Sequence, residues 1–342
     1  VEITGWSGTS VTVTLTYTTV ATYSNRAKVT STSAAYTDSA WSSSDSIIIS
    51  SSWAFGGTNS GFTAGGLTWS KSDTIDKFSF SSNTTATDHG DLSVARGDPA
   101  GQSSSDSGFT SGGNYSSGMT NVIDKFSFTS NTTASDHGDL STSREGPSGS
   151  SSSTYGFSAG GREPSFVDTI DRFAFSSNTT ASDHGDLSVV RSQTGGQSST
   201  DYGFTSGGDY SSGVRNVIDK FAFSSNTTAS DHGDLSRSNR LLASQSSTDY
   251  GFNSGGLNGA RSDVIDRFAF SSNTTASDHG DLSVVRHGPA GQSSTDYGFS
   301  SGGYDGSAVS NIIDRFSFTS NTTASDWGDI SVSRLSCSGT QY

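Results

Sequence analysis

Short runs of alternating apolar and polar residues recur along the chain, separated by stretches rich in Ser, Asn, Asp and Gly. In the segment 121–128, Phe126 and Phe128 fall on one face of an extended strand, and Ile123 and Lys125 fall on the other. No window shows the 3.6-residue apolar period of an amphipathic helix. The pattern therefore predicts an all-β protein built from short strands.

The same strand pattern repeats at a fixed spacing. The string Ile-Asp-(Lys/Arg)-Phe begins at Ile75, Ile123, Ile170, Ile218, Ile265 and Ile313, in steps of 47 or 48 residues. A Gly-Phe segment ending in a double glycine precedes each copy, and Gly-Asp-(Leu/Ile)-Ser follows it. Self-similarity at this period is typical of propellers and other repeat architectures.

Each repeat unit contains enough β signals for one propeller blade. In the second unit we expect strands at 103–104, 108–113 and 121–128, and a fourth beginning at 138–141. Four strands in about 48 residues match a blade in size. We therefore predict a six-bladed β-propeller over residues 52–342, with either Ile47–Phe55 or Leu335–Tyr342 completing the closing blade.

Residues 1–51 lack the repeat signature. Val11, Val13 and Leu15 alternate with threonines, and Ile47–Ile49 form another β-rich run. We interpret 1–51 as a small β-rich anchor, linker or assembly segment. The alternative is that it forms a degenerate seventh blade.

The repeat resembles the kelch family of β-propellers. The resemblance rests on the order Tyr-Gly-Phe-x-x-Gly-Gly, then the Ile-Asp-x-Phe strand, then Leu-x-x-x-Arg, which recurs with single substitutions in some of the six units. The characteristic kelch Trp is absent from the Gly-Asp-Leu strand. The frame is also similar to repeats in predicted structural proteins of marine phages and environmental sequences. These resemblances imply a propeller that acts as a structural or binding protein.

Composition and charge exclude several functions. Hydrophobic residues make up 30% of the 342 residues, against roughly 45–50% in typical globular chains. A net charge of −14, with 19 Lys and Arg, disfavours a nucleic-acid binder. No apolar run is long enough for a transmembrane helix, and the single cysteine, Cys337, excludes an internal disulfide framework. Because the chain begins at Val1, we expect a processed protein or a fragment.

Charged residues recur in nearly every repeat, and sixfold presence favours a structural role over a catalytic one. We expect Asp–Arg or Asp–Lys pairs between neighbouring strands or blades. The aspartates are Asp76, Asp124, Asp171, Asp219, Asp266 and Asp314, and the arginines are Arg96, Arg144, Arg191, Arg286 and Arg334. The fourth copy has Asn239 at the Arg position, with Arg240 next to it.

The repeated Asp-His-Gly-Asp segment could suggest a metal site. His89, His137, His184, His232 and His279 occupy it in five units, and Trp327 replaces the histidine in the sixth. Zinc would need further His or Cys ligands, and no EF-hand spacing supports calcium. We therefore predict a turn with Asx-type hydrogen bonds, no metal and no cofactor, with calcium on the carboxylates as the weaker alternative.

Each unit carries a formal N-glycosylation sequon, Asn-Thr-Thr. The asparagines are Asn83, Asn131, Asn178, Asn226, Asn273 and Asn321. In a eukaryotic secretory protein they would carry a ring of glycans. We favour the alternative that they are turn residues.

Two sets of loops differ from unit to unit: those after the double glycine and those around the repeated Arg. In an up-and-down blade both sets emerge on the same face, and recognition on a rigid scaffold is usually carried by loops. Aromatic residues and Arg anchor interfaces. Our candidate binding residues on this variable face are Trp69, Lys71, Tyr115, Arg162, Phe166, Tyr210, Arg215, Arg261 and Tyr304.

The sequence contains no Gly-x-Ser-x-Gly elbow and no phosphate-binding Gly-x-x-x-x-Gly-Lys loop, so we expect a protein that is not an enzyme. We expect a structural and binding protein on a virion, such as a phage fibre or appendage, or on a cell surface. Its partners would be structural proteins of that surface or surface glycans. The alternatives are a lectin with repeated sugar sites and a fibre subunit that self-assembles through residues 1–51. Drift in unconstrained loops would also explain the variable face.

Overall fold

A computed structural model describes residues 2–7, 10–14 and 57–342 of the protein. The chain divides into two units, Val1–Ser52 and Trp53–Tyr342, and each is described by itself. In the first unit, β1 (Glu2–Ser7) and β2 (Ser10–Thr14) form an antiparallel hairpin. The predicted strand position Leu15 and the run Ile47–Ile49 lie outside the described residues.

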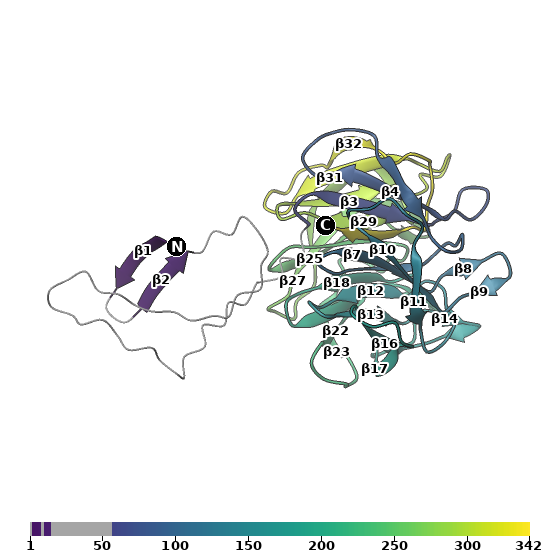
Figure 1. Ribbon diagram of the computed structural model, residues 1–342, viewed down its shortest axis with the longest axis horizontal. Helices are drawn as coiled ribbons and strands as arrows, with labels where there is room; N and C mark the ends of the chain where they lie inside the picture. Colours follow the sequence, from purple (N-terminus) through teal and green to yellow (C-terminus); the bar gives the residue numbers. More distant parts are fainter. Residues whose placement is uncertain (1, 8–9, 15–56) are drawn as a thin grey trace. The chain divides into compact units, whose positions relative to one another are not determined.

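The second unit is a six-bladed β-propeller, which confirms the predicted fold class (Figure 1). Six antiparallel sheets share one up-and-down strand order, and each inner strand contacts the inner strands of both neighbouring blades. The ring therefore closes with six blades, so the seven-bladed alternative is wrong. Within the part of the chain that is described, no helix is long and apolar enough to cross a membrane.

We number the blades 1 to 6 and give the strands in that order. The inner strands are β33 (Ser338–Gln341), β6 (Ala100–Ser103), β12 (Ser148–Ser151), β18 (Gly195–Ser198), β24 (Ala243–Ser246) and β29 (Ala290–Ser293). The second strands are β3 (Ser60–Ala64), β7 (Ser107–Ser111), β13 (Tyr155–Ala159), β19 (Tyr202–Ser206), β25 (Tyr250–Ser254) and β30 (Tyr297–Ser301).

The outer half of each blade is formed by the Ile-Asp-x-Phe strand and the Asp-His-Gly-Asp strand. The third strands are β4 (Thr74–Ser79), β10 (Val122–Ser127), β16 (Thr169–Ala174), β22 (Val217–Ala222), β27 (Ala260–Ala269) and β31 (Ile312–Ser317). The outer strands are β5 (Thr87–Asp91), β11 (Ser135–Asp139), β17 (Ser182–Asp186), β23 (Ser230–Asp234), β28 (Ser277–Arg286) and β32 (Ser325–Asp329).

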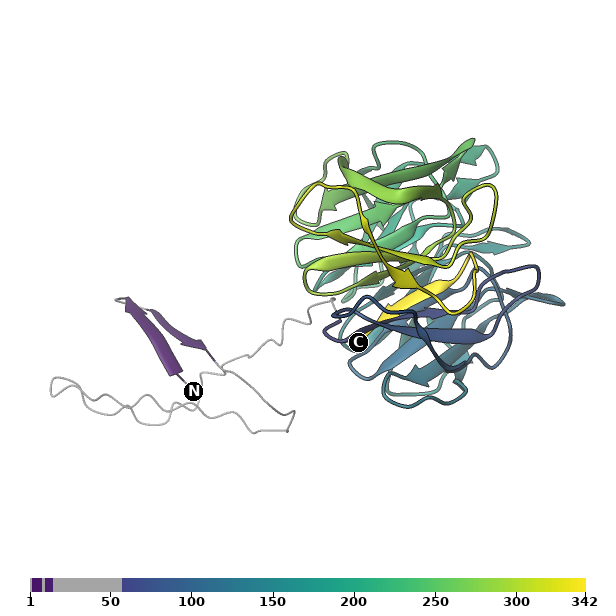
Figure 2. The same ribbon diagram turned by 90° about the horizontal axis from the view of Figure 1, so that it is seen from above.

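The C-terminal strand closes the ring. β33 pairs with β3 in an antiparallel ladder from Ala64↔Ser338 to Gly61↔Gln341. Figure 2 shows this yellow strand beside the blue strands of blade 1. Of the two predicted closing segments, Leu335–Tyr342 is therefore the one that contains the inner strand of blade 1, while Ile47–Phe55 lies outside the described residues.

The predicted position of the outer strand was wrong. The strand of blade 2 covers Ser135–Asp139 and ends before Leu140, whereas we expected a strand beginning at 138. The Asx-type hydrogen bond exists, from the Gly138 N–H to Asp136 Oδ1 at 2.9 Å. It lies within the strand, where the register against β10 shifts, so the segment is a bulged strand and not a connecting turn.

The hydrophobic core is divided into six cores, one at each seam between neighbouring blades. At the seam of blades 1 and 2, Phe62 stacks on Phe128 with ring centroids 4.9 Å apart. Ile75 and Leu92 of blade 1 complete this core together with residues of blade 2. Small separate cores explain how a chain with 30% hydrophobic residues folds, because each seam needs only a few large side chains.

Hydrogen bonds also link the inner strands around the axis. The Ser103 N–H donates to Ser151 Oγ of the next blade at 3.0 Å, and the Ser151 N–H donates to Ser198 Oγ at 2.9 Å. These strands approach so closely that a Cβ on Gly149 would lie 2.2 Å from the Gly101 carbonyl oxygen. Glycine at this position therefore permits the narrow axial channel.

A second ring of hydrogen bonds surrounds the axis where the blades are linked. Six residues have positive φ there, and each donates its N–H to the carbonyl of its counterpart in the preceding linker. They are Asp98, Gly146, Gln193, Leu241, Gly288 and Ser336. The Asp98 N–H donates to the Ser336 oxygen at 2.9 Å, which closes the circle.

Candidate functional site

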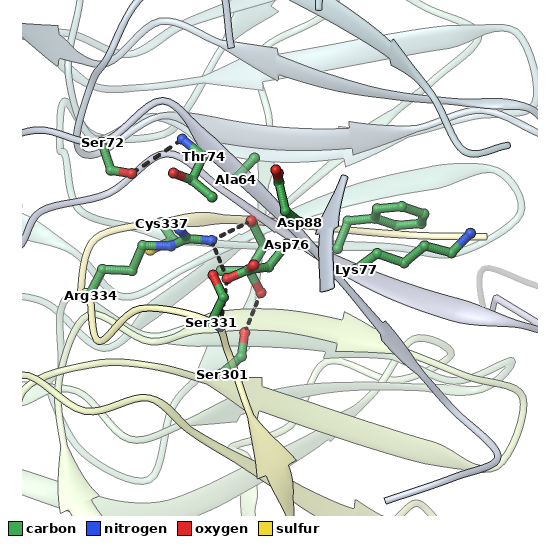
Figure 3. A network of polar contacts seen from close by, with 12 residues as sticks. Ala64, Ser72, Thr74, Asp76, Lys77, Asp88, Ser301, Ser331, Arg334 and Cys337 are labelled. Carbon is green, nitrogen blue, oxygen red and sulfur yellow. Dashed lines mark hydrogen bonds and ion pairs between the residues drawn. The ribbon is translucent and has the colours of Figure 1, made fainter. Parts of the chain in front are cut away.

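Five of the predicted aspartates form buried ion pairs with the predicted arginines, and each pair crosses a seam. The pairs are Arg96–Asp124, Arg144–Asp171, Arg191–Asp219, Arg286–Asp314 and Arg334–Asp76, with N–O distances of 2.8–3.0 Å. Figure 3 shows the last pair, which joins the C-terminal segment to blade 1; Asp76 also accepts the Ser331 N–H. These charges hold neighbouring blades together, and because they are buried in ion pairs they are not exposed to a ligand.

The seam of blades 4 and 5 has no such pair. Asn239 replaces the arginine, and its side-chain amide donates to the Gly255 carbonyl at 2.8 Å. Asp266 is only 5% exposed and accepts the Ser236 N–H at 3.2 Å. Burial raises the pKa of this carboxyl, because desolvation disfavours its charged form. The adjacent Arg240 pairs instead with Asp209, at 2.9 Å.

The repeated histidines also bridge seams. His89 Nε2 lies 2.8 Å from the Ser127 carbonyl oxygen of the next blade, and its ring packs edge-on against Phe62. In the sixth unit the indole N–H of Trp327 donates to the Ser79 oxygen at 2.8 Å. Since an indole nitrogen can only donate, the shared geometry indicates that the histidines carry their proton on Nε2.

The sequon asparagines have a similar role. Asn131 Nδ2 donates to the Asp88 carbonyl of the preceding blade at 3.1 Å, and the other five asparagines make the equivalent bond at 3.1–3.4 Å. All six are exposed. These contacts fit the predicted turn role, while glycosylation stays a prediction. Within the described residues, no group of three or more His, Cys, Asp or Glu side chains could hold a metal ion.

The loops after the second strands form short hairpins, and we call the face that carries them the hairpin face. Their named strands are β8 (Asn114–Tyr115), β9 (Gly118–Met119), β14 (Arg162–Glu163), β15 (Ser165–Phe166), β20 (Asp209–Tyr210), β21 (Gly213–Val214) and β26 (Leu257–Asn258). Bridges such as Gly97↔Asn114 and Ser192↔Asp209 join hairpins to the linkers between blades. Both variable loop sets therefore lie on one face.

The hairpins alternate between two forms. Those of blades 1, 3 and 5 end in Asp73, Asp168 and Asp263, whereas those of blades 2, 4 and 6 are one residue longer and end in Asn121, Asn216 and Asn311. In each odd–even pair, the fifth residue of the odd hairpin contacts the next hairpin. The contacts are Lys71 Nζ to the Tyr115 carbonyl, Phe166 to the Tyr210 ring and Arg261 to the Tyr304 ring.

The structure thus brings seven of the nine candidate binding residues into side-by-side groups. Phe166 and Arg215 both contact Tyr210, with centroid distances of 6.0 and 5.2 Å. Arg162 makes an ion pair with Glu145 of the preceding linker and joins none of these groups. Trp69 is fully exposed at the tip of its hairpin, without a ring contact. Its indole is the largest apolar side chain offered to solvent in the described residues.

The opposite face carries repeated cation–aromatic pairs. Tyr155 lies under Arg172 at 4.8 Å, and Tyr250 lies under Arg267 at the same distance. Tyr155 and Tyr250 also pack against seam cores, so part of each ring is already covered. These repeated pairs extend the hydrophobic cores at the seams. The aromatic and charged side chains that differ from blade to blade are concentrated on the hairpin face.

Sequence reasoning missed the two hydrogen-bonded rings around the axis. Four inner strands carry Gln-Ser, which was a usable signal, and Gln102, for example, donates to the Phe157 carbonyl of the next blade at 3.0 Å. The linker ring had no such signal, because its six members belong to five residue types.

The chain matches no protein-family model, and no curated protein matches it significantly. What the structure defines is therefore the class, a six-bladed all-β propeller. The kelch resemblance stays a prediction.

Proposed function

We propose that this propeller is a non-enzymatic binding platform, displayed on a virion or cell surface, that engages its partner through the hairpin face. One observation carries the proposal. The chemistry repeated in every blade is occupied in holding seams together, while the aromatic and cationic side chains that differ between blades gather on the hairpins. A partner is either a surface glycan or a structural protein of the same surface.

This arrangement favours one composite site over a lectin with repeated sites. Equivalent sugar sites need equivalent side chains in each blade, but the hairpin position of Arg261 is Lys71 in blade 1 and Phe166 in blade 3. Large aromatic residues and arginines are the side chains that most often dominate binding energy. Trp69, Tyr210 and Tyr304 are therefore the expected anchors.

The test replaces Tyr115, Tyr210 and Tyr304 with Ser in one variant and measures binding to arrays of glycans and of surface proteins. We expect loss of binding with an unchanged β-sheet circular dichroism spectrum and an unfolding midpoint within a few degrees of the parent. Replacing Tyr202, which is exposed on the opposite face, with Ser is the control. Retained binding in the hairpin variant, or a stoichiometry near six ligands per chain, contradicts the proposal.

A further inference from the structure

The hairpin face is divided into two halves of different charge. Apart from the buried seam arginines, the hairpins and following linkers of blades 1–3 carry two basic and five acidic residues: Lys71, Arg162, Asp73, Asp98, Glu145, Glu163 and Asp168. Those of blades 4–6 carry four arginines and three aspartates: Arg215, Arg237, Arg240, Arg261, Asp209, Asp263 and Asp305. In a protein with a net charge of −14, this second half, which we call the basic half, is an exception.

Two arginines of the basic half have no carboxylate partner. Arg215 lies over the Tyr210 ring at 5.2 Å and donates only to the Ser212 hydroxyl, at 3.1 Å. Arg261 lies over the Tyr304 ring at 4.7 Å. None of the ion pairs among the described residues includes either arginine, whereas Arg162 and Arg240 are both paired. A guanidinium stacked on an aromatic ring keeps its planar N–H groups available for bidentate bonds to an anion.

The charge of Arg261 acts on Asp305, but the two side chains form no ion pair among the described residues. Asp305 belongs to the hairpin of blade 6, and its Oδ1 accepts hydrogen bonds from Ser307 and Ala308 at 2.6–2.8 Å. These bonds hold the pKa of Asp305 below its usual range. The carboxylate is thus fixed within its own turn and makes no ion pair within 4.0 Å.

His287 lies beside Tyr304, between the hairpins of blades 5 and 6. Its ring packs edge-on against Tyr304 at 5.6 Å, and its Nδ1 is buried without a hydrogen-bond partner. Burial, and then the charges of Arg261 and Arg240, lower the pKa of His287 to about 4. Two arginines therefore act on the same point between the hairpins of blades 5 and 6.

We propose that the Arg215–Tyr210 and Arg261–Tyr304 pairs bind the carboxylate groups of an acidic polysaccharide that runs across blades 4–6. The inference rests on the proposed function, because it places a ligand on the same face. A sugar chain fits better than an acidic peptide, since the hairpins here offer Ser, Asn, Gly and aromatic rings. One cavity is lined mainly by Gly and Ser of the inner strands and another by linker residues, and neither lining includes these arginines.

The test measures binding of hyaluronate, which has one carboxylate per disaccharide, against dextran of similar length, with the full chain. Arg215→Gln combined with Arg261→Gln is expected to weaken hyaluronate binding at least tenfold. The matched control, Arg172→Gln combined with Arg267→Gln on the opposite face, removes the same charge from two similar cation–aromatic pairs and should change binding less than twofold. Raising the salt concentration should weaken binding by the parent more than by the arginine variant.

Three outcomes overturn the inference, and the first two leave the proposed binding face standing. Equal binding of dextran and hyaluronate that depends on Tyr210 and Tyr304 removes the charge argument but supports the binding face. Tighter binding of poly-glutamate than of hyaluronate would show that the ligand of these arginines is an acidic peptide and not a sugar chain. Hyaluronate binding that none of the hairpin-face variants changes contradicts both this inference and the proposed function.

Discussion

The buried aspartates show how one side chain can tie two neighbouring blades together. Asp171 accepts hydrogen bonds from Arg144 and from both the N–H and the hydroxyl of Ser141, all at 2.8–2.9 Å. Both members of the ion pair are fully buried. Removing one partner of such a pair leaves an uncompensated charge, which is far more costly than the pair itself is stabilising.

We therefore expect Asp171→Asn to lower the free energy of unfolding by about 3–5 kcal/mol, because Arg144 stays buried without its counter-charge. Urea titration at pH 7 measures the loss. Arg162→Gln, which breaks the exposed pair with Glu145, is the control and should cost less than about 1 kcal/mol. Equal losses in the two variants would show that the buried pair has no special role.

Replacing the equivalent aspartate at the seam of blades 4 and 5, Asp266, should have a different effect on the free energy of unfolding. Asp266 has no arginine partner, and its raised pKa means that the folded state binds the proton more tightly than the unfolded state. Its contribution to stability is therefore lost as pH rises through the folded pKa. We expect Asp266→Asn to leave stability at pH 7 unchanged or higher, with the benefit over the parent shrinking as pH falls towards 4. A loss like that of Asp171→Asn contradicts this.

The seam histidines give a pH dependence of the opposite sign. Burial lowers the pKa of His89, His184, His232 and His279, so the folded state disfavours their protonation. Their contribution to stability is complete above the unfolded pKa of about 6.5 and is lost as pH falls below it. The free energy of unfolding should decrease from pH 7 to pH 5, measured by urea titration.

His184→Gln is the informative variant for this effect, because the Gln amide can donate to the Ala222 carbonyl without titrating. Its decrease between pH 7 and pH 5 should be smaller than that of the parent. Nitrogen NMR of the parent at pH 7 should show the Nε2–H tautomer. An Nδ1–H tautomer would contradict the geometry shared with Trp327.

At the scale of elements, the closing strand β33 is important for the stability of the propeller. β33 is the inner strand of blade 1 and pairs with β3 at four register positions. Deleting 338–342 removes this ladder and leaves the edge of β3 open. At about 1 kcal/mol per hydrogen bond, we expect a loss on the order of 4 kcal/mol or more, seen as a lower midpoint in thermal unfolding. Deleting 1–51 is the control and should leave the propeller midpoint unchanged.

The elements could be predicted where side chains determine them. Phe126 alternates with polar residues, and its strand, β10, formed within the expected range and ended one residue before Phe128. The limits of the outer strand were missed, because Asp136 and Gly138 are typical of turns, and only the neighbouring strand and blade make them a bulged edge strand. The linker ring was beyond sequence reasoning, since it is made by backbone groups of residues as different as Leu241 and Gly288.

The candidate site was predictable in part for a related reason. Variation among the repeats indicated which loops differ, and the bridges of the structure place both loop sets on one face. The groupings within that face were not predictable. Arg261 and Tyr304 belong to the hairpins of two neighbouring blades. The arrangement of the blades around the axis brings the guanidinium over the Tyr304 side chain rather than over another aromatic side chain.

At the scale of the molecule, the alternation of the hairpins reaches beyond binding. Blades 1 and 2, 3 and 4, and 5 and 6 form three pairs, each with one short and one long hairpin in contact. A rotation by two blades superimposes one pair on the next and returns to the start after three steps. The propeller is in this sense a trimer whose subunits share one chain. We expect a chain of only two blades to contain the seam within a pair, and three copies of it to rebuild the ring through the seam between pairs, because a head-to-tail interface with this rotation closes on itself.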